Sequence, residues 1–292
     1  MAVNITTKVF LAVCLAATAA LSANAARVER FNPKNGTGIE GSDGKKLAAV
    51  LTIPDGATAD IPIVIFCHGF RSHKGGAVGP ELTNQLVPYG VATMCFDFNA
   101  HGDSEGDFID MTVPNEIEDA VKVYEYIRSR PEFGKIAFAG HSQGGVVAAM
   151  AAGQLGDGKI SGLALWAAAA VLKDDAIRGH CMIYHCDPAN PPVVGIDLGD
   201  GRRLGREFVL TAQKLPIYET AAKYKGGACV INGSSDVIVP VKYGRRFHGV
   251  LLGSCFHLIP EEDHNFGHDH KASVAIGAKY FLQLFGKLPA GA

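Results

Sequence analysis

The segment 140–145 (GHSQGG) contains the residue types that a serine nucleophile requires. It matches the pattern G-x-S-x-G, in which the serine lies on a sharp turn between a strand and a helix. The strand-like stretch Lys135–Ala139 precedes it, and the alanine-rich, helix-like stretch Val146–Leu155 follows it. Small neighbours allow the turn, and the N-terminus of the following helix favours developing negative charge. The pattern therefore predicts that Ser142 is a nucleophile, although a glycine-rich turn alone could also produce it.

A serine hydroxyl needs a general base, and the base needs a carboxylate to orient it. In folds that place a nucleophilic serine on such a turn between a strand and a helix, the three residues follow the chain order Ser, Asp, His. Asp236 follows the strand-like stretch Ala228–Asn232, and His264 lies between the last strand-like and the last helix-like stretches. We therefore predict a triad of Ser142, Asp236 and His264. A turn-forming role for Asp236 stays open, as do three rival bases: His257, His268 and His270.

Acyl transfer also needs two donors directed at the developing oxyanion. The backbone N–H of Gln143, directly after the nucleophile, is one candidate. The chain reads HGF at 68–70, after the apolar stretch Ile61–Cys67, and the second donor is therefore predicted to be the Phe70 N–H.

Apolar strand-like stretches alternate with amphipathic helix-like stretches along the chain. Strands that are apolar on both faces and alternate with helices predict a mostly parallel sheet covered on both sides. We expect helices at Glu81–Tyr89, Pro114–Arg130, Val146–Leu155, Lys242–Phe247 and Lys271–Phe285. Eight strands are expected, at Arg27–Phe31, Lys46–Ile53, Ile61–Cys67, Val91–Phe98, Lys135–Ala139, Ile160–Trp166, Ala228–Asn232 and Ser254–Ile259.

Two segments depart from this alternation. Residues 1–25 combine Lys8, a short apolar run and an A-x-A site at 23–25, which predicts a secretory signal peptide rather than a membrane anchor. The remaining residues, 26–292, are expected to form one α/β domain. The stretch Leu172–Leu215 is long and rich in glycine and proline, which predicts a short cap inserted at the rim of the sheet.

Cysteine and histidine usage leaves a few alternatives open. Cys14 falls in the predicted signal peptide, and Cys67, Cys95, Cys229 and Cys255 lie in apolar runs that favour buried thiols. Cys181 and Cys186 lie in the polar insertion and are a possible disulfide pair. We predict no metal site, although two clusters would allow one: His264, His268, Asp269 and His270, and His180, Cys181, His185 and Cys186.

The charge pattern excludes one class of partner. The formal net charge is −2, and Arg202, Arg203 and Arg206 are the nearest approach to a basic cluster, so we expect no nucleic-acid partner. No further stretch predicts a membrane span, and the sequence leaves the oligomeric state open.

The sequence resembles the bacterial feruloyl (cinnamoyl) esterases of the α/β-hydrolase fold over nearly all of residues 26–292. The matching motifs are HGF at 68–70, DFNAHGDS at 97–104, MTVPNEIED at 111–119, GHSQGGVV at 140–147, LKDDA at 172–176 and LPIYE at 215–219. The resemblance implies the same triad and oxyanion donors and no cofactor. It also implies a cap that contacts the acyl group, where Asp175 and Phe208 are candidate substrate-binding residues. An aromatic that carries a phenol hydroxyl in relatives aligns with Phe208 or Val209.

The expectation is therefore an exported serine hydrolase that cleaves carboxylic esters through an acyl-enzyme. Its substrate would be a small-molecule or polysaccharide-linked ester with a hydroxycinnamoyl, other aromatic or medium acyl group. A peptidase or thioesterase of the same fold, a lipase, and a non-catalytic binding protein that kept the fold are the alternatives.

Overall fold

The computed structural model describes residues 26–76, 78–156 and 158–288. The predicted signal peptide lies outside the described residues. Among the helices of the described part, none is both long and apolar enough to cross a membrane.

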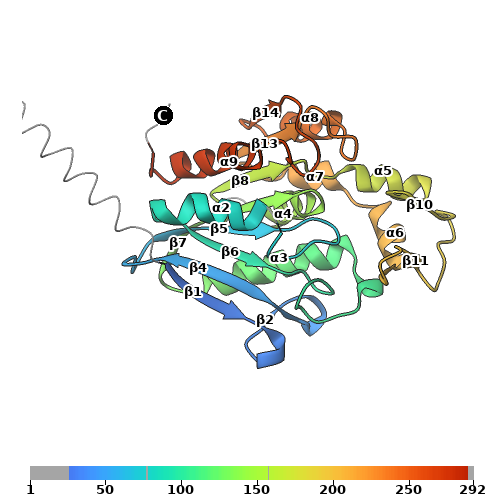
Figure 1. Ribbon diagram of the computed structural model, residues 1–292, viewed down its shortest axis with the longest axis horizontal. Coiled ribbons are helices and arrows are strands. Elements are labelled where there is room, and N and C mark those ends of the chain that lie inside the picture. Colours follow the sequence, from blue (N-terminus) through green and yellow to red (C-terminus); the bar gives the residue numbers. More distant parts are fainter. Residues whose placement is uncertain (1–25, 77, 157, 289–292) are drawn as a thin grey trace, which may run out of the picture.

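An eight-stranded sheet forms the centre of the molecule (Figure 1), in the order β1-β4-β6-β5-β7-β8-β13-β14. β4 pairs antiparallel with both β1 and β6, and the neighbouring pairs from β6 to β14 are parallel. This arrangement confirms the predicted α/β-hydrolase fold. The strands are β1 (Ala26–Phe31), β4 (Ala49–Pro54), β5 (Ile61–Cys67), β6 (Ala92–Phe96), β7 (Phe133–His141), β8 (Gly162–Trp166), β13 (Gly227–Gly233) and β14 (Cys255–Ile259).

Helices cover both faces of the sheet, so each face has its own buried apolar cluster. On one face α2 (Val78–Leu86) packs beside α9 (His270–Leu284). On the other face lie α3 (Val113–Arg128), α4 (Gln143–Leu155), α7 (Ile217–Ala221) and α8 (Val241–Val250). The central strands β5, β6 and β8 are buried on both faces, which explains their continuous apolar sequences.

Local sequence determines where elements begin. The Thr112 side chain caps α3 by accepting a hydrogen bond from the Asn115 N–H, and a proline occupies the first turn. The strand expected at Lys46–Ile53 is divided at Ala48, whose N–H donates to Ser104 Oγ at 2.8 Å. Its first part, β3 (Lys46–Leu47), pairs with β2 (Ile39–Glu40), and its second part is β4.

The segment between β8 and α7 contains short elements and projects from one end of the sheet (Figure 1). An ion pair between Arg71 and Asp200, with 2.5 Å between nitrogen and oxygen, joins it to the loop after β5. Its elements are α5 (Val171–Arg178), β9 (His180–Cys181), β10 (Tyr184–His185), β11 (Ile196–Asp197), β12 (Arg203–Leu204) and α6 (Arg206–Ala212).

The possible disulfide between Cys181 and Cys186 is not formed in this structure, where both are free thiols. In the β9–β10 hairpin Cys181 pairs with Tyr184, and the Cys186 N–H donates to the Gly179 carbonyl. The two cysteines are therefore offset along the hairpin instead of lying opposite each other. Spacing in the sequence does not reveal this register.

Candidate active site

Ser142 lies at the turn between β7 and α4 in a strained conformation. Its φ is 56° and its ψ is −124°, a combination that non-glycine residues rarely adopt. The Ser142 N–H donates to the Trp166 carbonyl and the Ser142 carbonyl accepts from the Ala169 N–H, both at 2.9 Å. The end of β8 and the residues after it therefore hold the turn in place.

The glycines around Ser142 are required by backbone contacts. A Cβ on Gly140 would lie 2.2 Å from the Gly144 carbonyl oxygen. A Cβ on Gly144 would lie 2.2 Å from the carbonyl oxygens of both Cys67 and His68. These distances are far inside van der Waals contact, so the α4 N-terminus can approach β5 and β7 only because these positions lack side chains.

The structure brings the three predicted triad residues together. His264 Nε2 lies 2.9 Å from Ser142 Oγ, and His264 Nδ1 lies 2.9 Å from Asp236 Oδ2. All three residues are buried. In this arrangement the serine hydroxyl donates to Nε2 while Nδ1–H donates to the carboxylate, which is the tautomer that a general base requires.

Asp236 is held by its own loop after β13. Its Oδ1 accepts the N–H groups of Ile238 and Val239, at 2.9 and 2.7 Å, which leaves Oδ2 for His264. The turn-forming role considered for Asp236 and its contact with His264 therefore coexist, one on each oxygen.

The rival histidines do not enter this relay. His257 lies within β14 and is exposed, while His270 begins α9. His268 is exposed and lies 4.0 Å from Glu261. Because both ring nitrogens of His264 are engaged by Ser142 and Asp236, the metal cluster considered around His264 is disfavoured.

Two residues near the relay residues in the sequence make contacts that were not predicted: His141 and Glu262. The His141 imidazole donates from Nε2 to the His264 carbonyl at 2.8 Å, and burial lowers the pKa of His141 to about 4, so its ring is neutral. Glu262 is buried and accepts the N–H groups of His268 and Asp269 at 3.1 and 2.6 Å. His141 is the variable residue before the serine in G-x-S-x-G, and that position was the available signal.

The loop that carries Phe70 is fixed by a buried histidine. His68 Nδ1–H donates to the Gly69 carbonyl at 2.8 Å, and His68 Nε2 accepts the Phe98 N–H at 3.1 Å. Burial lowers the pKa of His68 well below its usual value, in keeping with this neutral tautomer. A Cβ on Gly69 would lie 3.1 Å from the Ser142 Cβ, so this loop passes directly beside the serine.

Gln143 is the first residue of α4, and its N–H therefore has no acceptor within the helix. Its side-chain amide donates to Glu116 Oε2 at 2.7 Å. Glu116 is fully buried on α3, and burial raises its pKa well above the usual range. The Glu116 carboxyl thus anchors the residue whose backbone is the predicted oxyanion donor.

Aromatic side chains line the region beside the Phe70 loop. The Phe70 ring centroid lies 5.7 Å from that of Phe108 and 5.9 Å from that of Phe208. The Arg202 guanidinium lies 5.2 Å from the Phe108 ring centroid. Phe208, from α6, therefore adjoins a residue of the predicted oxyanion loop.

Asp175, the other predicted substrate-binding residue, is partly buried on α5. The pKa of Asp175 is raised above its usual value because the effect of burial outweighs the opposing effect of His180. Its neighbour Asp174 accepts a 2.6 Å hydrogen bond from the Tyr243 hydroxyl, so α5 is tied to α8.

The strained serine, the relay behind it and the sheet define a class of protein. The chain has the α/β-hydrolase fold, and its buried Ser142, His264 and Asp236 are arranged as in a serine hydrolase. A family model described as "Serine aminopeptidase, S33" matches residues 59–183, a stretch that includes Ser142 and ends before Asp236 and His264.

Solved structures extend the similarity over most of the chain. Est1E from Butyrivibrio proteoclasticus with ferulic acid bound is 27% identical, with a TM-score of 0.80 over 85% of this chain and 99% of that one. A second structure of Est1E is 25% identical, with a TM-score of 0.76 over 89% and 99%. These similarities confirm the predicted resemblance.

Curated relatives match a shorter stretch. The rat lysophosphatidylserine lipase ABHD12 is 31% identical over 97 residues, which is 32% of this chain and 23% of that protein. The human protein ABHD12B is 31% identical over 91 residues, 31% of this chain and 24% of that protein. The chain thus spans about a quarter of the length of the curated relatives it matches.

Proposed function

We propose that this protein is a carboxylic ester hydrolase that acts through an acyl-enzyme, with an aromatic acyl group as its preferred substrate. The observation that carries the proposal is the buried relay of Ser142, His264 and Asp236, with both contacts at 2.9 Å. The N–H groups of Phe70 and Gln143 flank this serine and are suited to stabilise an oxyanion.

In the proposed mechanism Ser142 Oγ attacks the ester carbonyl and its proton passes to His264 Nε2. Asp236 holds the imidazole and stabilises the positive charge that forms on it. The tetrahedral intermediate collapses when His264 returns the proton to the leaving alcohol. A water molecule, deprotonated by His264, then cleaves the acyl-enzyme and releases the acid and Ser142.

The aromatic rings beside the oxyanion loop support an aromatic acyl group. The rings of Phe70, Phe108 and Phe208 pack together beside this loop, and aromatic rings interact favourably with a planar aromatic group. The ferulic acid bound to the similar protein Est1E points to the same chemistry. We therefore propose hydroxycinnamoyl esters, free or linked to polysaccharide, as the first substrates to examine.

The test is a panel of initial rates with p-nitrophenyl acetate, p-nitrophenyl butyrate, methyl cinnamate and methyl ferulate, with Ser142→Ala as the blank. We expect turnover of all four, with kcat/KM highest for the two aromatic acyl esters. Turnover of only the activated p-nitrophenyl esters would contradict the aromatic preference and leave the ester chemistry in place. Activity of the Ser142→Ala protein equal to that of the wild type would contradict the mechanism.

The matching family model supports a second candidate, an aminopeptidase. Such an enzyme has to bind the free ammonium group of its substrate, and Asp175, on α5 within the predicted cap, is the candidate carboxylate. Turnover of an amino-acid p-nitroanilide that is lost on N-acetylation of the substrate would favour this candidate. Equal inactivity toward the free and acetylated anilides would exclude it.

We also propose that the protein is exported, which rests on the sequence of residues 1–25. The expected mature protein begins at Ala26. Mass spectrometry of the protein recovered outside the cytoplasm of a bacterial host tests this. An intact N-terminus on protein confined to the cytoplasm would refute it.

A further inference from the structure

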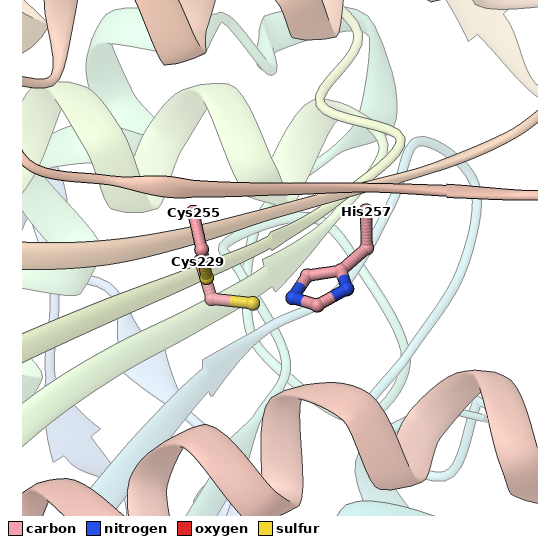
Figure 2. A group of neighbouring side chains, drawn as sticks. All are labelled: Cys229, Cys255 and His257. Carbon is pink, nitrogen blue, oxygen red and sulfur yellow. The ribbon is translucent and has the colours of Figure 1, made fainter. Parts of the chain in front are cut away.

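Three side chains outside the catalytic relay gather at the edge of the sheet. Cys229 of β13 pairs in register with Cys255 of β14, and His257 follows two residues later on the same face of β14. The two sulfur atoms and a ring nitrogen of His257 all lie within 4.8 Å of one another. Figure 2 shows the Cys229 sulfur and the imidazole directed toward each other beneath the two strands.

The surroundings differ on the two sides of this group. Cys229 is fully buried in the apolar cluster between the sheet and α9. Cys255 and His257 lie on the edge strand and are reached by solvent. A solvated ion can therefore approach from the edge and be held against a rigid, buried thiol.

Both thiols can reach one ion. Cys229 and Cys255 are in register on neighbouring strands, and their sulfur atoms lie within 4.8 Å of each other. Cysteines bind metals as thiolates, so each of the two would lose its proton when the ion binds.

We propose that Cys229, Cys255 and His257 form a binding site for a thiophilic cation of the Zn²⁺ type, with water as the fourth ligand. Two thiolates and one imidazole are a preferred donor set for Zn²⁺. Zn–S bonds of about 2.3 Å and Zn–N bonds of about 2.0 Å in a tetrahedron separate ligand atoms by roughly 3.5–3.8 Å. Rotation of the accessible His257 and Cys255 side chains provides the contraction from the observed spacing. Each cysteine binds as a thiolate, so the thiol protons are released to solvent as the metal binds.

The site would join the two strands that lead to the relay. The loop after β13 carries Asp236, and the residues after β14 include His264. A metal bridge between Cys229 and Cys255 would therefore fix the edge strand β14 against β13 and stabilise the fold there. This inference does not depend on the proposed esterase activity, because its test measures metal and stability.

The experiment uses the full chain, reduced and freed of metal by a chelator, and titrated with Zn²⁺ against a chromophoric chelator. Co²⁺ serves as a second probe, because thiolate-to-cobalt charge transfer and d–d bands report a tetrahedral sulfur site. We expect one equivalent of Zn²⁺ to bind. At a hundredfold excess over Kd, Tm should rise by about 5–10 °C.

Variants locate the ion. Cys255→Ser and His257→Gln change accessible side chains and should fold, and each should weaken Zn²⁺ binding at least about tenfold. Cys186→Ser is the matched thiol control and should bind Zn²⁺ as the wild type does. Wild-type binding no tighter than that of Cys255→Ser, or loss of binding in Cys186→Ser, would overturn the proposal.

Discussion

The Asp236→Asn variant tests the relay with the least change in shape. Asp236 Oδ1 accepts two backbone N–H groups, and Oδ2 accepts His264 Nδ1–H. An asparagine keeps both backbone bonds only if its oxygen takes the Oδ1 position, which turns the amide NH₂ toward His264. Nδ1 must then act as an acceptor, and the ring proton moves to Nε2.

A proton on Nε2 faces Ser142 Oγ, so the imidazole can no longer accept the serine proton. The corresponding change in a serine protease lowers kcat about 10⁴-fold. Four factors of ten correspond to about 5.5 kcal/mol of activation free energy. We therefore expect kcat on p-nitrophenyl butyrate to fall about 10⁴-fold, with Tm nearly unchanged because the two backbone bonds remain.

Asp263→Asn is the matched control. The Asn265 and Gly267 N–H groups both donate to Asp263 Oδ1, at 2.9 and 3.1 Å, so an asparagine can keep both bonds. Its activity should stay within about threefold of the wild type, because a surface substitution of this kind costs little. A loss of less than about 100-fold in Asp236→Asn, or an equal loss in the control, would refute this account of Asp236.

Three further predictions concern the turn, the buried carboxyl and the aromatic region. Gly144→Ala should cost several kcal/mol of unfolding free energy because its Cβ would lie 2.2 Å from two carbonyl oxygens, whereas Gly249→Ala, in open space on α8, should be neutral or raise stability. Chemical denaturation measures both variants, and equal effects would contradict the packing argument. Burial raises the pKa of Glu116, so this carboxyl favours the folded state at low pH, and its contribution to stability is lost as the pH rises. The Tm of Glu116→Gln should therefore exceed that of the wild type at about pH 8 and equal it near pH 4, and a Tm difference that does not change with pH would contradict this. Phe208→Ala should lower kcat/KM for methyl cinnamate at least about tenfold and leave p-nitrophenyl acetate nearly unaffected, and a parallel loss on both esters would argue against contact with the acyl group.

Much of the fold follows from sequence patterns that act locally. Continuous apolar runs identified the buried strands, and the spacing of apolar residues identified helices such as α3. Ser142 could be predicted in the same way, because the strained turn requires glycine at fixed positions and these glycines form a short sequence motif. Asp236 and His264 followed from chain order, since parallel strands deliver the loops after β13 and β14 to one edge of the sheet.

Contacts that depend on how strands and helices pair in three dimensions could not be predicted from the sequence. The offset of Cys181 and Cys186 depends on how a short hairpin pairs, and no residue pattern fixes that pairing. The Cys229–Cys255 pair was interpreted as two buried thiols, because apolar runs reveal burial and not which strands are neighbours. Glu116 belongs to a motif that the sequence singled out, yet its contact with Gln143 requires α3 to pack against α4.

If Ser142 is the activated nucleophile, a fluorophosphonate forms a covalent adduct with it, and intact-mass spectrometry measures that adduct. We expect one adduct per chain, mapped to Ser142 by peptide analysis, and none on Ser142→Ala. Labelling of Asp236→Asn should be slower by orders of magnitude. Folded wild-type protein that takes no label, or a label that persists in Ser142→Ala, would contradict the assignment of Ser142 as the nucleophile.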